Sequence, residues 1–370
     1  MTMHNGSERE FIMKVLHYFV MMCIITSMCI LYGCKKVVND NNPPEPAERN
    51  RILFCDDNWY LLGVNYPWIH YGHDFGTTAW GHDGVSADPA VAEQDFEEMA
   101  ACGIRVVRWF VFADGRASPE FDENGSVTGF DSFFFEDMDA ALGVAQNHGI
   151  YLVLVLFDFH LCDTARVENG VQLGGHADLI TNPAKRQSFI NNALTPMLSR
   201  YQTHRHILSW EVMNEPEWAM TIEGGGTVGQ PVPTEAMQEF VHLIVQSVEE
   251  NAPQQLVTVG SASRKWLDLW KQSGLDFYQY HYYDWMESET PFDVHYDQLG
   301  LDKPCILGEF PTKNSNINVG TYLEKAWSNY LAGSLGWSFR AGDQYSGFSC
   351  QPFMEWRQAH PDAPVDIRCP

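Results

Sequence analysis

Eight short apolar runs, each followed by an amphipathic stretch, constrain the fold of this 370-residue chain more than any other feature. The expected strands are residues 61–66, 104–110, 150–157, 207–215, 255–260, 277–282, 304–310 and 334–339. The expected helices are residues 89–101, 131–147, 183–201, 235–250, 264–272, 291–299 and 322–331, with a less regular segment at 351–360. This alternation is typical of βα units and a parallel sheet. It predicts an α/β protein, a (β/α)8 TIM barrel, in a single domain of residues 51–370.

An apolar, nearly uncharged run over residues 15–33 precedes this domain and ends at Cys34. Such a run is typical of a secretory signal. Its last residues are similar to a bacterial lipobox, although Tyr32 is bulkier than the usual small residue. We predict a lipoprotein-type signal peptide over residues 1–34, with Met13 as the true start and Cys34 as the lipidated residue. The alternative is an uncleaved membrane anchor, for which the run is just long enough.

Residues 35–50 are rich in Pro and Asn and lack hydrophobic periodicity, so they are expected to form a disordered tether. Signal and tether together predict an exported, membrane-anchored lipoprotein at the cell surface or in the periplasm. The domain itself contains no metal-binding cysteine spacing, which disfavours zinc. One disulfide is compatible with the sequence, and Cys350 and Cys369 are candidate partners.

The formal net charge of −25 disfavours nucleic acid and anionic membrane surfaces as partners of the folded domain. A neutral or cationic partner fits better. The chain contains 12 Trp, 15 Tyr and 22 Phe, and exposed aromatic rings can stack on the apolar faces of sugars. The composition is therefore compatible with a carbohydrate ligand.

In a (β/α)8 barrel the functional side chains lie at the C-terminal ends of the strands. The polar and aromatic residues at these ends are Asn65, Trp68, Arg108, Asp158, His160, Asn214, Glu215, Ser261, His281, Tyr283, Glu309 and Trp337. Glu215 follows the fourth strand and Glu309 the seventh. Because these strands lie on opposite sides of the barrel, the two carboxylates can face each other across a substrate.

Taken in order along six strands, these residues resemble the clan A glycoside hydrolases, glycoside hydrolase family 5 in particular. The resemblance rests on residues 103–108, His160, Asn214-Glu215-Pro216, residues 281–283, residues 308–310 and Trp337. It covers roughly residues 55–345. An isolated Asn-Glu-Pro would be weak support, but the ordered set is specific.

The resemblance implies a retaining β-glycosidase in which Glu215 is the general acid/base and Glu309 the nucleophile. Such chemistry requires two carboxyl groups about 5 to 5.5 Å apart with different pKa values, that of the acid being the higher. The resemblance further implies that Arg108 and Tyr283 favour the ionised form of Glu309 and that Asn214 binds the sugar 2-hydroxyl. It places Trp337 below the subsite next to the scissile bond, and gives His160 and His281 the task of holding substrate hydroxyls or catalytic side chains. No metal or other cofactor is implied.

Several of these residues have structural alternatives. Arg108 could neutralise Glu211, a role compatible with one beside Glu309. His160, His281 and Trp337 could be ordinary core residues. Asp158 and Asp163 could line the cleft or simply be solvated in loops.

Two other classes of function compete with a glycosidase. A metal-dependent hydrolase could use the loop that carries His70, His73 and Asp74, with His82. No matching set of ligands recurs on other strand ends, which disfavours it. A non-catalytic glycan-binding lipoprotein is the second alternative, and the presence of both Glu215 and Glu309 opposes it.

The expected substrate is an extracellular β-mannan or β-glucan, as polysaccharide or oligosaccharide. The sequence does not distinguish the two. Long loops at residues 163–181 and 221–233 suggest that one end of the groove is walled off, which would favour exo over endo cleavage.

Overall fold

Eight parallel strands form a closed barrel in the computed structural model, which describes residues 50–229 and 231–369. The strands are β3 (Leu61–Asn65), β4 (Val106–Ala113), β7 (Tyr151–Asp158), β10 (Ile207–Asn214), β11 (Leu256–Ser261), β12 (Tyr278–His281), β13 (Cys305–Pro311) and β14 (Gly333–Trp337). They pair in chain order, and β14 closes the barrel against β3. The predicted (β/α)8 fold is thus confirmed. The expected signal peptide, Cys34 and the tether up to residue 49 lie outside the described residues.

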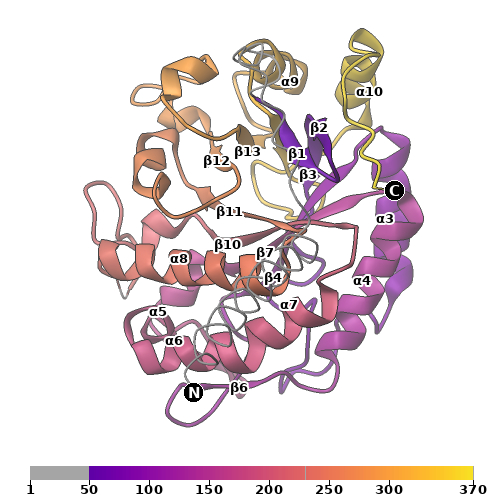
Figure 1. The fold of residues 1–370 in the computed structure, drawn as a ribbon. Helices are drawn as coiled ribbons and strands as arrows, with labels where there is room; N and C mark the ends of the chain where they lie inside the picture. The colour runs from indigo at the N-terminus through magenta and orange to yellow at the C-terminus, as the bar shows by residue number, and fades with distance from the viewer. Residues whose placement is uncertain (1–49, 230, 370) are drawn as a thin grey trace, which may run out of the picture. The chain divides into compact units, whose positions relative to one another are not determined.

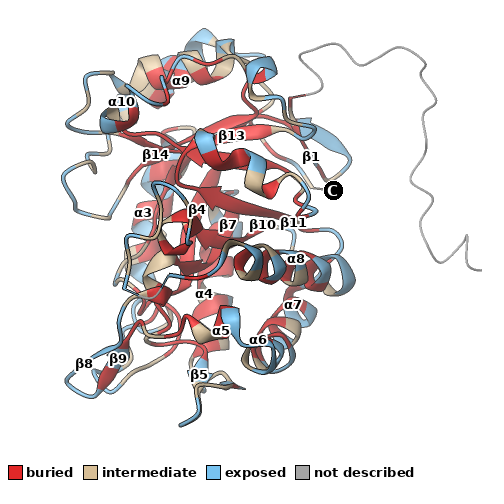
Figure 2. Ribbon diagram, turned by 90° about the vertical axis from the view of Figure 1, so that its left-hand side faces the viewer, coloured by how far each residue is buried: buried red, intermediate tan, exposed pale blue. Residues whose placement is uncertain are grey.

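Helices surround the strands, and their inner faces are buried while their outer faces are exposed (Figures 1 and 2). They are α3 (Pro89–Ala101), α4 (Phe134–His148), α5 (Asp178–Thr181), α6 (Pro183–Phe189), α7 (Thr195–Tyr201), α8 (Thr234–Asn251), α9 (Val319–Ser328) and α10 (Cys350–Ala359). In α8 the buried residues Met237, Phe240, Val241 and Ile244 recur at the spacing of one helix face. None of the helices in these residues has the length and apolar character needed to cross a membrane.

Two expected helices differ in the structure. The helix expected over 183–201 is interrupted by a π-helical segment, η2 (Ile190–Leu194), just before Pro196. Proline has no N–H, so a regular α-helix could not bond the carbonyl four residues earlier, and a wider turn forms instead. The segment after β11 is a 3₁₀ helix, η4 (Arg264–Trp270), rather than an α-helix.

The final third of the chain also departs from expectation. The helix expected over 291–299 is reduced to a single 3₁₀ turn, η6 (Tyr296–Leu299), which ends at Gly300 in a left-handed conformation. By contrast, the irregular segment at the C-terminus forms α10, because Phe353 and Trp356 are buried against the barrel wall.

The barrel interior is apolar at the N-terminal ends of the strands. Its side chains there are Leu61, Val106, Val153, Leu208, Ile306 and Leu335, all fully buried. A short hairpin of β1 (Ile52–Phe54) and β2 (Asp57–Trp59), which the sequence did not indicate, packs against this layer. The N-terminal end of the barrel is therefore closed.

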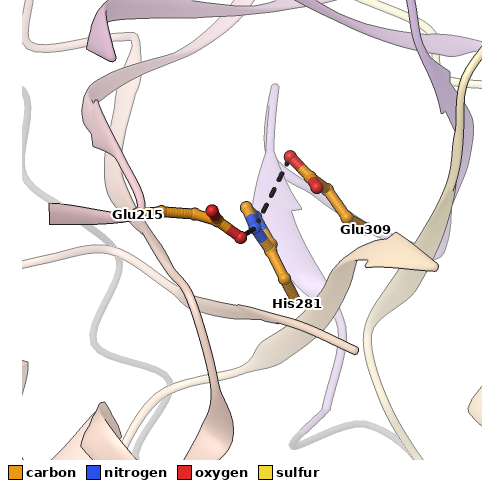
Figure 3. Close-up of side chains that lie close together, drawn as sticks. All are labelled: Glu215, His281 and Glu309. Atoms are coloured by element: carbon orange, nitrogen blue, oxygen red, sulfur yellow. Dashed lines mark hydrogen bonds and ion pairs between the residues drawn. The ribbon is translucent and has the colours of Figure 1, made fainter. Parts of the chain in front are cut away.

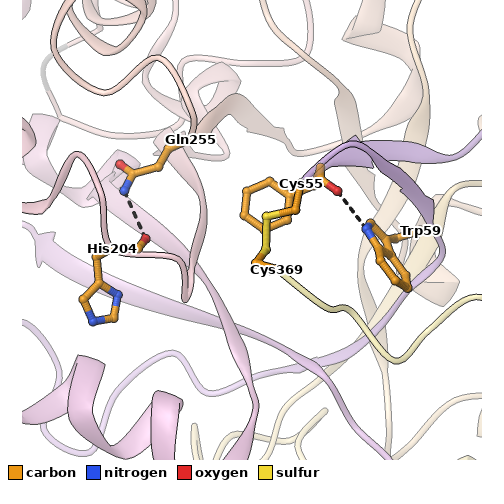
Figure 4. Close-up of a disulfide and its surroundings, with 6 residues drawn as sticks. Cys55, Trp59, His204, Gln255 and Cys369 are labelled. Carbon is orange, nitrogen blue, oxygen red and sulfur yellow. Dashed lines mark hydrogen bonds between the residues drawn. A yellow bond between two sulfur atoms is a disulfide. The ribbon is translucent and has the colours of Figure 1, made fainter.

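Two disulfides connect distant parts of the chain, and the expected pair of Cys350 with Cys369 is wrong. Cys55 after β1 bonds to Cys369, and Cys102 after α3 bonds to Cys350. The first joins the closing hairpin to the C-terminal tail (Figure 4). The partners differ because α10 carries Cys350 to the end of α3, whereas the tail beyond α10 continues to the N-terminal end of the barrel.

At the C-terminal ends of the strands the loops are longer and carry short elements of their own. Two hairpins follow β4 and β7, namely β5 (Glu120–Phe121) with β6 (Val127–Gly129) and β8 (Arg166–Glu168) with β9 (Val171–Leu173). Short 3₁₀ turns follow β7, β10 and β12, namely η1 (Phe159–Cys162), η3 (Pro216–Ala219) and η5 (Asp284–Met286). The loop with β8 and β9 and the three 3₁₀ turns contribute residues to the site described next.

Candidate active site

Glu215 and Glu309 face each other at the C-terminal end of the barrel, with His281 between them (Figure 3). Glu309 lies within β13, and Glu215 directly follows β10. Glu215 has a left-handed backbone with φ of 46°, and its N–H donates to the Gly260 carbonyl at 2.6 Å. An L-residue with a side chain rarely adopts this conformation, so the surrounding contacts must hold it. One oxygen of each carboxylate and one nitrogen of His281 lie within 4.8 Å of one another.

His281 contacts both carboxylates. Its Nδ1 is hydrogen-bonded to Oε1 of Glu215 at 2.8 Å and lies 3.5 Å from Oε1 of Glu309. The ring is buried, and burial lowers the pKa of His281 to about 4. The imidazole is therefore neutral at pH 7 and can exchange the roles of hydrogen-bond donor and acceptor as the carboxyls change protonation.

Arg108 is fully buried beneath the pair and is shared between two carboxylates. Its Nη1 donates to Oε1 of Glu309 at 2.7 Å, while Nη2 and Nε bond both oxygens of Glu211 at 2.5 and 2.7 Å. The two roles that the sequence left open for Arg108 therefore occur together. A buried guanidinium bonded to two carboxylates offsets part of their negative charge at the base of the site.

Tyr283 and Asn214 complete the contacts around this pair. The Tyr283 hydroxyl donates to Oε2 of Glu309 at 2.7 Å. The amide oxygen of Asn214 accepts from Arg108 at 2.8 Å, and its Nδ2 donates to Asp158 at 3.3 Å. Asp158 thus belongs to the site, which was one of the two possibilities open from the sequence.

The two carboxyls differ in pKa. Burial, together with the nearby Asp158 carboxylate, raises the pKa of Glu215 to about 8. Burial also raises the pKa of Glu309, to about 7, but His281, Arg108 and the Tyr283 hydroxyl oppose that rise. Glu309, which has Arg108 and the Tyr283 hydroxyl as partners, is therefore the first of the two carboxyls to ionise as the pH rises.

A cavity of about 280 Å³ opens above the pair. Its lining is mainly aromatic and acidic: Trp68, Phe110, Asp158, Phe159, His160, Asn214, Glu215, Trp218, Tyr283, Trp285, Glu309, Trp337, Asp343 and Tyr345. Trp337 donates through Nε1 to Asp343 at 2.7 Å. His160 is half-exposed on the wall, where its ring bonds Asp163 at 2.8 Å. All eight expected site residues except the buried Arg108 and His281 line this cavity, and those two support its carboxylates.

A second cavity of about 570 Å³ adjoins the first and shares Trp68, Asp158 and His160 with it. Its remaining lining comes from loops after β3, β4 and β7, with Gly229 from the loop after β10: Tyr71, Asp114, Arg116, Asp163, Thr164, Arg166, Leu173 and Gly229. In the barrel, β4 lies four strands from β12, the strand before Trp285. The cleft therefore extends from the carboxylate pair toward opposite sides of the barrel mouth.

Some site residues were not identified from the sequence. Trp218 donates through Nε1 to Oε2 of Glu215 at 2.9 Å, and Trp285 is an exposed cavity residue nearby. An aromatic residue three positions after the strand-end Glu215 could have indicated Trp218. Asp343 and Tyr345 lie in an irregular loop after β14, where periodicity gives no signal.

The expected alternative metal site in the first loop does not form. Nε2 of His73 bonds the Thr78 hydroxyl, and Nδ1 of His70 bonds the Asp83 carbonyl. Asp74 accepts from two backbone N–H groups of its own loop. Among residues 50–229 and 231–369, the only three ligand atoms close enough to hold a metal belong to Glu215, His281 and Glu309. The guanidinium of Arg108 against Glu309 opposes a cation there.

Comparison with known proteins identifies relatives over most of the chain. No family model matches. The mannan endo-1,4-beta-mannosidase of Mytilus edulis is 29% identical over 85% of this chain and 92% of its own length, and that of Cryptopygus antarcticus is 29% identical over 81% and 85%. The solved structure of the Mytilus edulis beta-mannanase superimposes with a TM-score of 0.73 at 26% identity, covering 88% of this chain and 100% of that one. A glycoside hydrolase family 5 mannosidase from Rhizomucor miehei shares the fold, with a TM-score of 0.56 at 14% identity, over 87% of this chain and 100% of its own. The chain thus resembles the clan A glycoside hydrolases, and glycoside hydrolase family 5 in particular, as its strand-end residues predicted.

Proposed function

We propose that the protein is a retaining endo-β-1,4-mannanase that works by double displacement, with Glu215 as acid/base and Glu309 as nucleophile. One observation carries the proposal: two carboxylates of unequal pKa lie at the base of an aromatic cleft, with one oxygen of each within 4.8 Å of the other. A retaining glycosidase needs carboxyl groups about 5 to 5.5 Å apart, whereas an inverting one needs about 6.5 to 9.5 Å to admit water. The spacing favours retention.

In the first step the ionised Glu309 attacks the anomeric carbon, and the glycosidic C–O bond breaks. The proton of Glu215 passes to the departing oxygen, and a glycosyl ester forms on Glu309. Arg108 and Tyr283 each donate to one oxygen of Glu309, which favours its ionised form before attack and orients it.

In the second step Glu215, now ionised, takes a proton from water as that water attacks the anomeric carbon of the glycosyl ester, and the bond from that carbon to Glu309 breaks. Glu309 leaves as a carboxylate, and the starting protonation state returns. His281 is bonded to Glu215 and lies against Glu309, so it orients the proton-carrying carboxyl through both steps.

The curated relatives are named mannan endo-1,4-beta-mannosidases, which supports a β-1,4-mannan substrate. Internal cleavage requires sugar-binding surface on both sides of the scissile bond. Trp218 and Trp285 offer aromatic surface on the side of Glu215, and the second cavity extends from the other side. The cleft geometry favours endo action.

The product profile on β-1,4-mannan and on manno- and gluco-oligosaccharides of increasing length tests this proposal. We expect internal cleavage of mannan and a first product with the β anomeric configuration by NMR. Preference for gluco-oligosaccharides would refute β-1,4-mannan as the substrate. A first product with the α configuration would refute the retaining mechanism.

One observation favours exo cleavage as a second candidate. The two long loops meet at the second cavity, where a Cβ on Gly229 would come within 2.1 Å of the Thr164 hydroxyl. If these loops block the cleft, the same digestion would release single short products from chain ends, with no early drop in mannan viscosity.

We also propose that the enzyme is exported and anchored through Cys34. The two disulfides support a compartment outside the reducing cytoplasm. Intact mass after membrane extraction tests the anchor, since a mature chain that begins anywhere but at a lipidated Cys34 would exclude it.

A further inference from the structure

Glu217 is a fully buried carboxylate two residues after Glu215, and the reaction described above does not use it. Its Oε1 accepts from the Trp270 indole N–H at 2.8 Å and from the Ser261 hydroxyl at 2.7 Å. Its Oε2 accepts from the Ala262 backbone N–H at 2.9 Å. An indole and a backbone amide can only donate, so each oxygen of Glu217 faces a group that requires an acceptor.

These bonds connect the turn after β10 to the loop after β11. The Glu217 carbonyl also accepts from the backbone N–H groups of Met220 and Gly226, which closes the turn on itself. Glu215 lies at the start of this turn with its left-handed backbone, and Trp218 within it donates to Oε2 of Glu215. The contacts of Glu217 therefore hold the turn that determines the position of the Glu215 carboxyl.

Asp74 provides a matched arrangement on the other side of the mouth. It is also buried, its Oδ2 accepts from the Trp109 indole and the Ile69 backbone N–H, both at 2.7 to 2.8 Å, and its Oδ1 accepts from the His70 N–H at 2.7 Å. The loop that it fixes carries Trp68, which lines both cavities, but neither catalytic carboxyl. The same donor chemistry thus holds an acid/base on one side and a substrate-binding wall on the other.

We propose that Glu217 is a positioning residue for the proton donor: its buried carboxylate fixes the backbone and orientation of Glu215, and so controls proton transfer to the leaving group. Asp74, by the same contacts, positions only the binding wall. This inference rests on the proposed function, because it assumes that Glu215 is the acid.

The roles of Glu217 and Asp74 can be distinguished by how kcat/KM of their variants depends on the leaving group of the substrate. Natural β-mannosidic bonds release a sugar alkoxide, which needs a proton, whereas 2,4-dinitrophenyl β-mannobioside releases a phenolate that leaves without one. The parameter kcat/KM reports the steps up to release of the leaving group. It should be measured for full-length wild type, Glu217→Gln and Asp74→Asn on mannotetraose and on the dinitrophenyl substrate.

For Glu217→Gln we expect kcat/KM on mannotetraose to fall by about 10 to 100-fold, part of the 10² to 10⁴ that general acid catalysis supplies. On the dinitrophenyl substrate kcat/KM should stay at the wild-type value. A burst of dinitrophenolate should appear, because the displaced Glu215 also slows hydrolysis of the glycosyl ester, and azide should abolish the burst by attacking that ester. Asp74→Asn should lower kcat/KM by the same factor on both substrates, because it raises KM.

Equal losses on both substrates for Glu217→Gln, or no loss on either, would overturn the inference. If wild type itself cleaves neither substrate, the proposed function fails instead, so the two failures are distinguishable. Should Glu217→Gln not fold, Trp270→Phe removes one donor to Oε1 and leaves a smaller aromatic ring in its place, and a smaller loss confined to mannotetraose is expected. Equal effects of that variant on both substrates would likewise refute the role.

Discussion

The two ends of the barrel differ in their side chains, apolar at one end and charged at the other, although the same strands run through both. On β10, Leu208 lies in an apolar layer at the N-terminal end, and Glu211 and Asn214 lie in a charged network at the C-terminal end. The first end is closed by a hairpin and a disulfide, and the second opens into a cleft.

This contrast separates stability from function along single strands. Burial of aliphatic side chains at the N-terminal end stabilises the fold without regard to precise hydrogen bonds. At the other end, burial raises the pKa values of both Glu215 and Glu309, and Glu215, with the higher pKa, is the one that retains its proton longer as the pH rises. Substitutions at the two ends should therefore change different measurements.

The largest effect is expected at the proposed catalytic pair, Glu215 and Glu309. Glu215→Gln should lower kcat on mannan by about 10² to 10⁴-fold, the usual contribution of general acid–base catalysis. Glu309→Ala should lower it at least as much, because no glycosyl ester can form. Thermal unfolding should change little in both, since neither substitution disturbs the apolar layer and Arg108 retains Glu211 as its ion-pair partner. Turnover that survives either substitution would remove that residue from the mechanism.

Removal of a disulfide tests the closed end. The double variant Cys55→Ser, Cys369→Ser releases a link across 314 residues and should cost about 2 to 5 kcal/mol of unfolding free energy, measured with urea. Activity at 25 °C should remain, because the link lies at the end away from the cleft. The pair Cys102→Ser, Cys350→Ser is a control for the loss of a disulfide elsewhere. An activity loss specific to the first variant would show that the two ends are coupled.

A cavity created in the apolar layer tests whether stability and function are separate along the single strand β10. Leu208→Ala should destabilise the fold by about 2 to 5 kcal/mol, the usual range for a fully buried leucine. Its kcat, measured at a temperature where the variant is folded, should match wild type. A reduced kcat with normal stability would contradict the separation of roles along β10.

The smallest effect is expected in the dependence of kcat/KM on pH. In the proposed mechanism the active form has Glu309 ionised and Glu215 protonated, so kcat/KM should rise as the pH passes the pKa of Glu309, about 7. It should fall again as the pH passes the pKa of Glu215, about 8. In Glu215→Gln the residual activity should lose only the alkaline fall. An alkaline limb that persists in this variant would assign that titration to another group.

Much of the barrel was predictable because strand and helix periods are local properties of sequence. The apolar run before Asn214, or the helix that begins at Pro89, can be recognised without knowledge of the rest of the chain. The π-helical turn before Pro196 and the loss of the helix after 291 depend on single residues and on packing, and they were missed. The disulfide partners were also missed, because Cys350 and Cys369 are close in sequence and yet each bonds to a different cysteine far away in the chain.

The sequence by itself determined the (β/α)8 architecture and the residues presented at the strand ends, since parallel strands direct their C-terminal residues to one edge. Only the tertiary structure decided how those residues share hydrogen bonds. Arg108 reaches Glu309 across 201 residues of sequence and Glu211 across 103, and Glu217 finds its indole partner 53 residues away. Local patterns carry no information about such distances. The state of each carboxyl depends on partners that the closed barrel brings together.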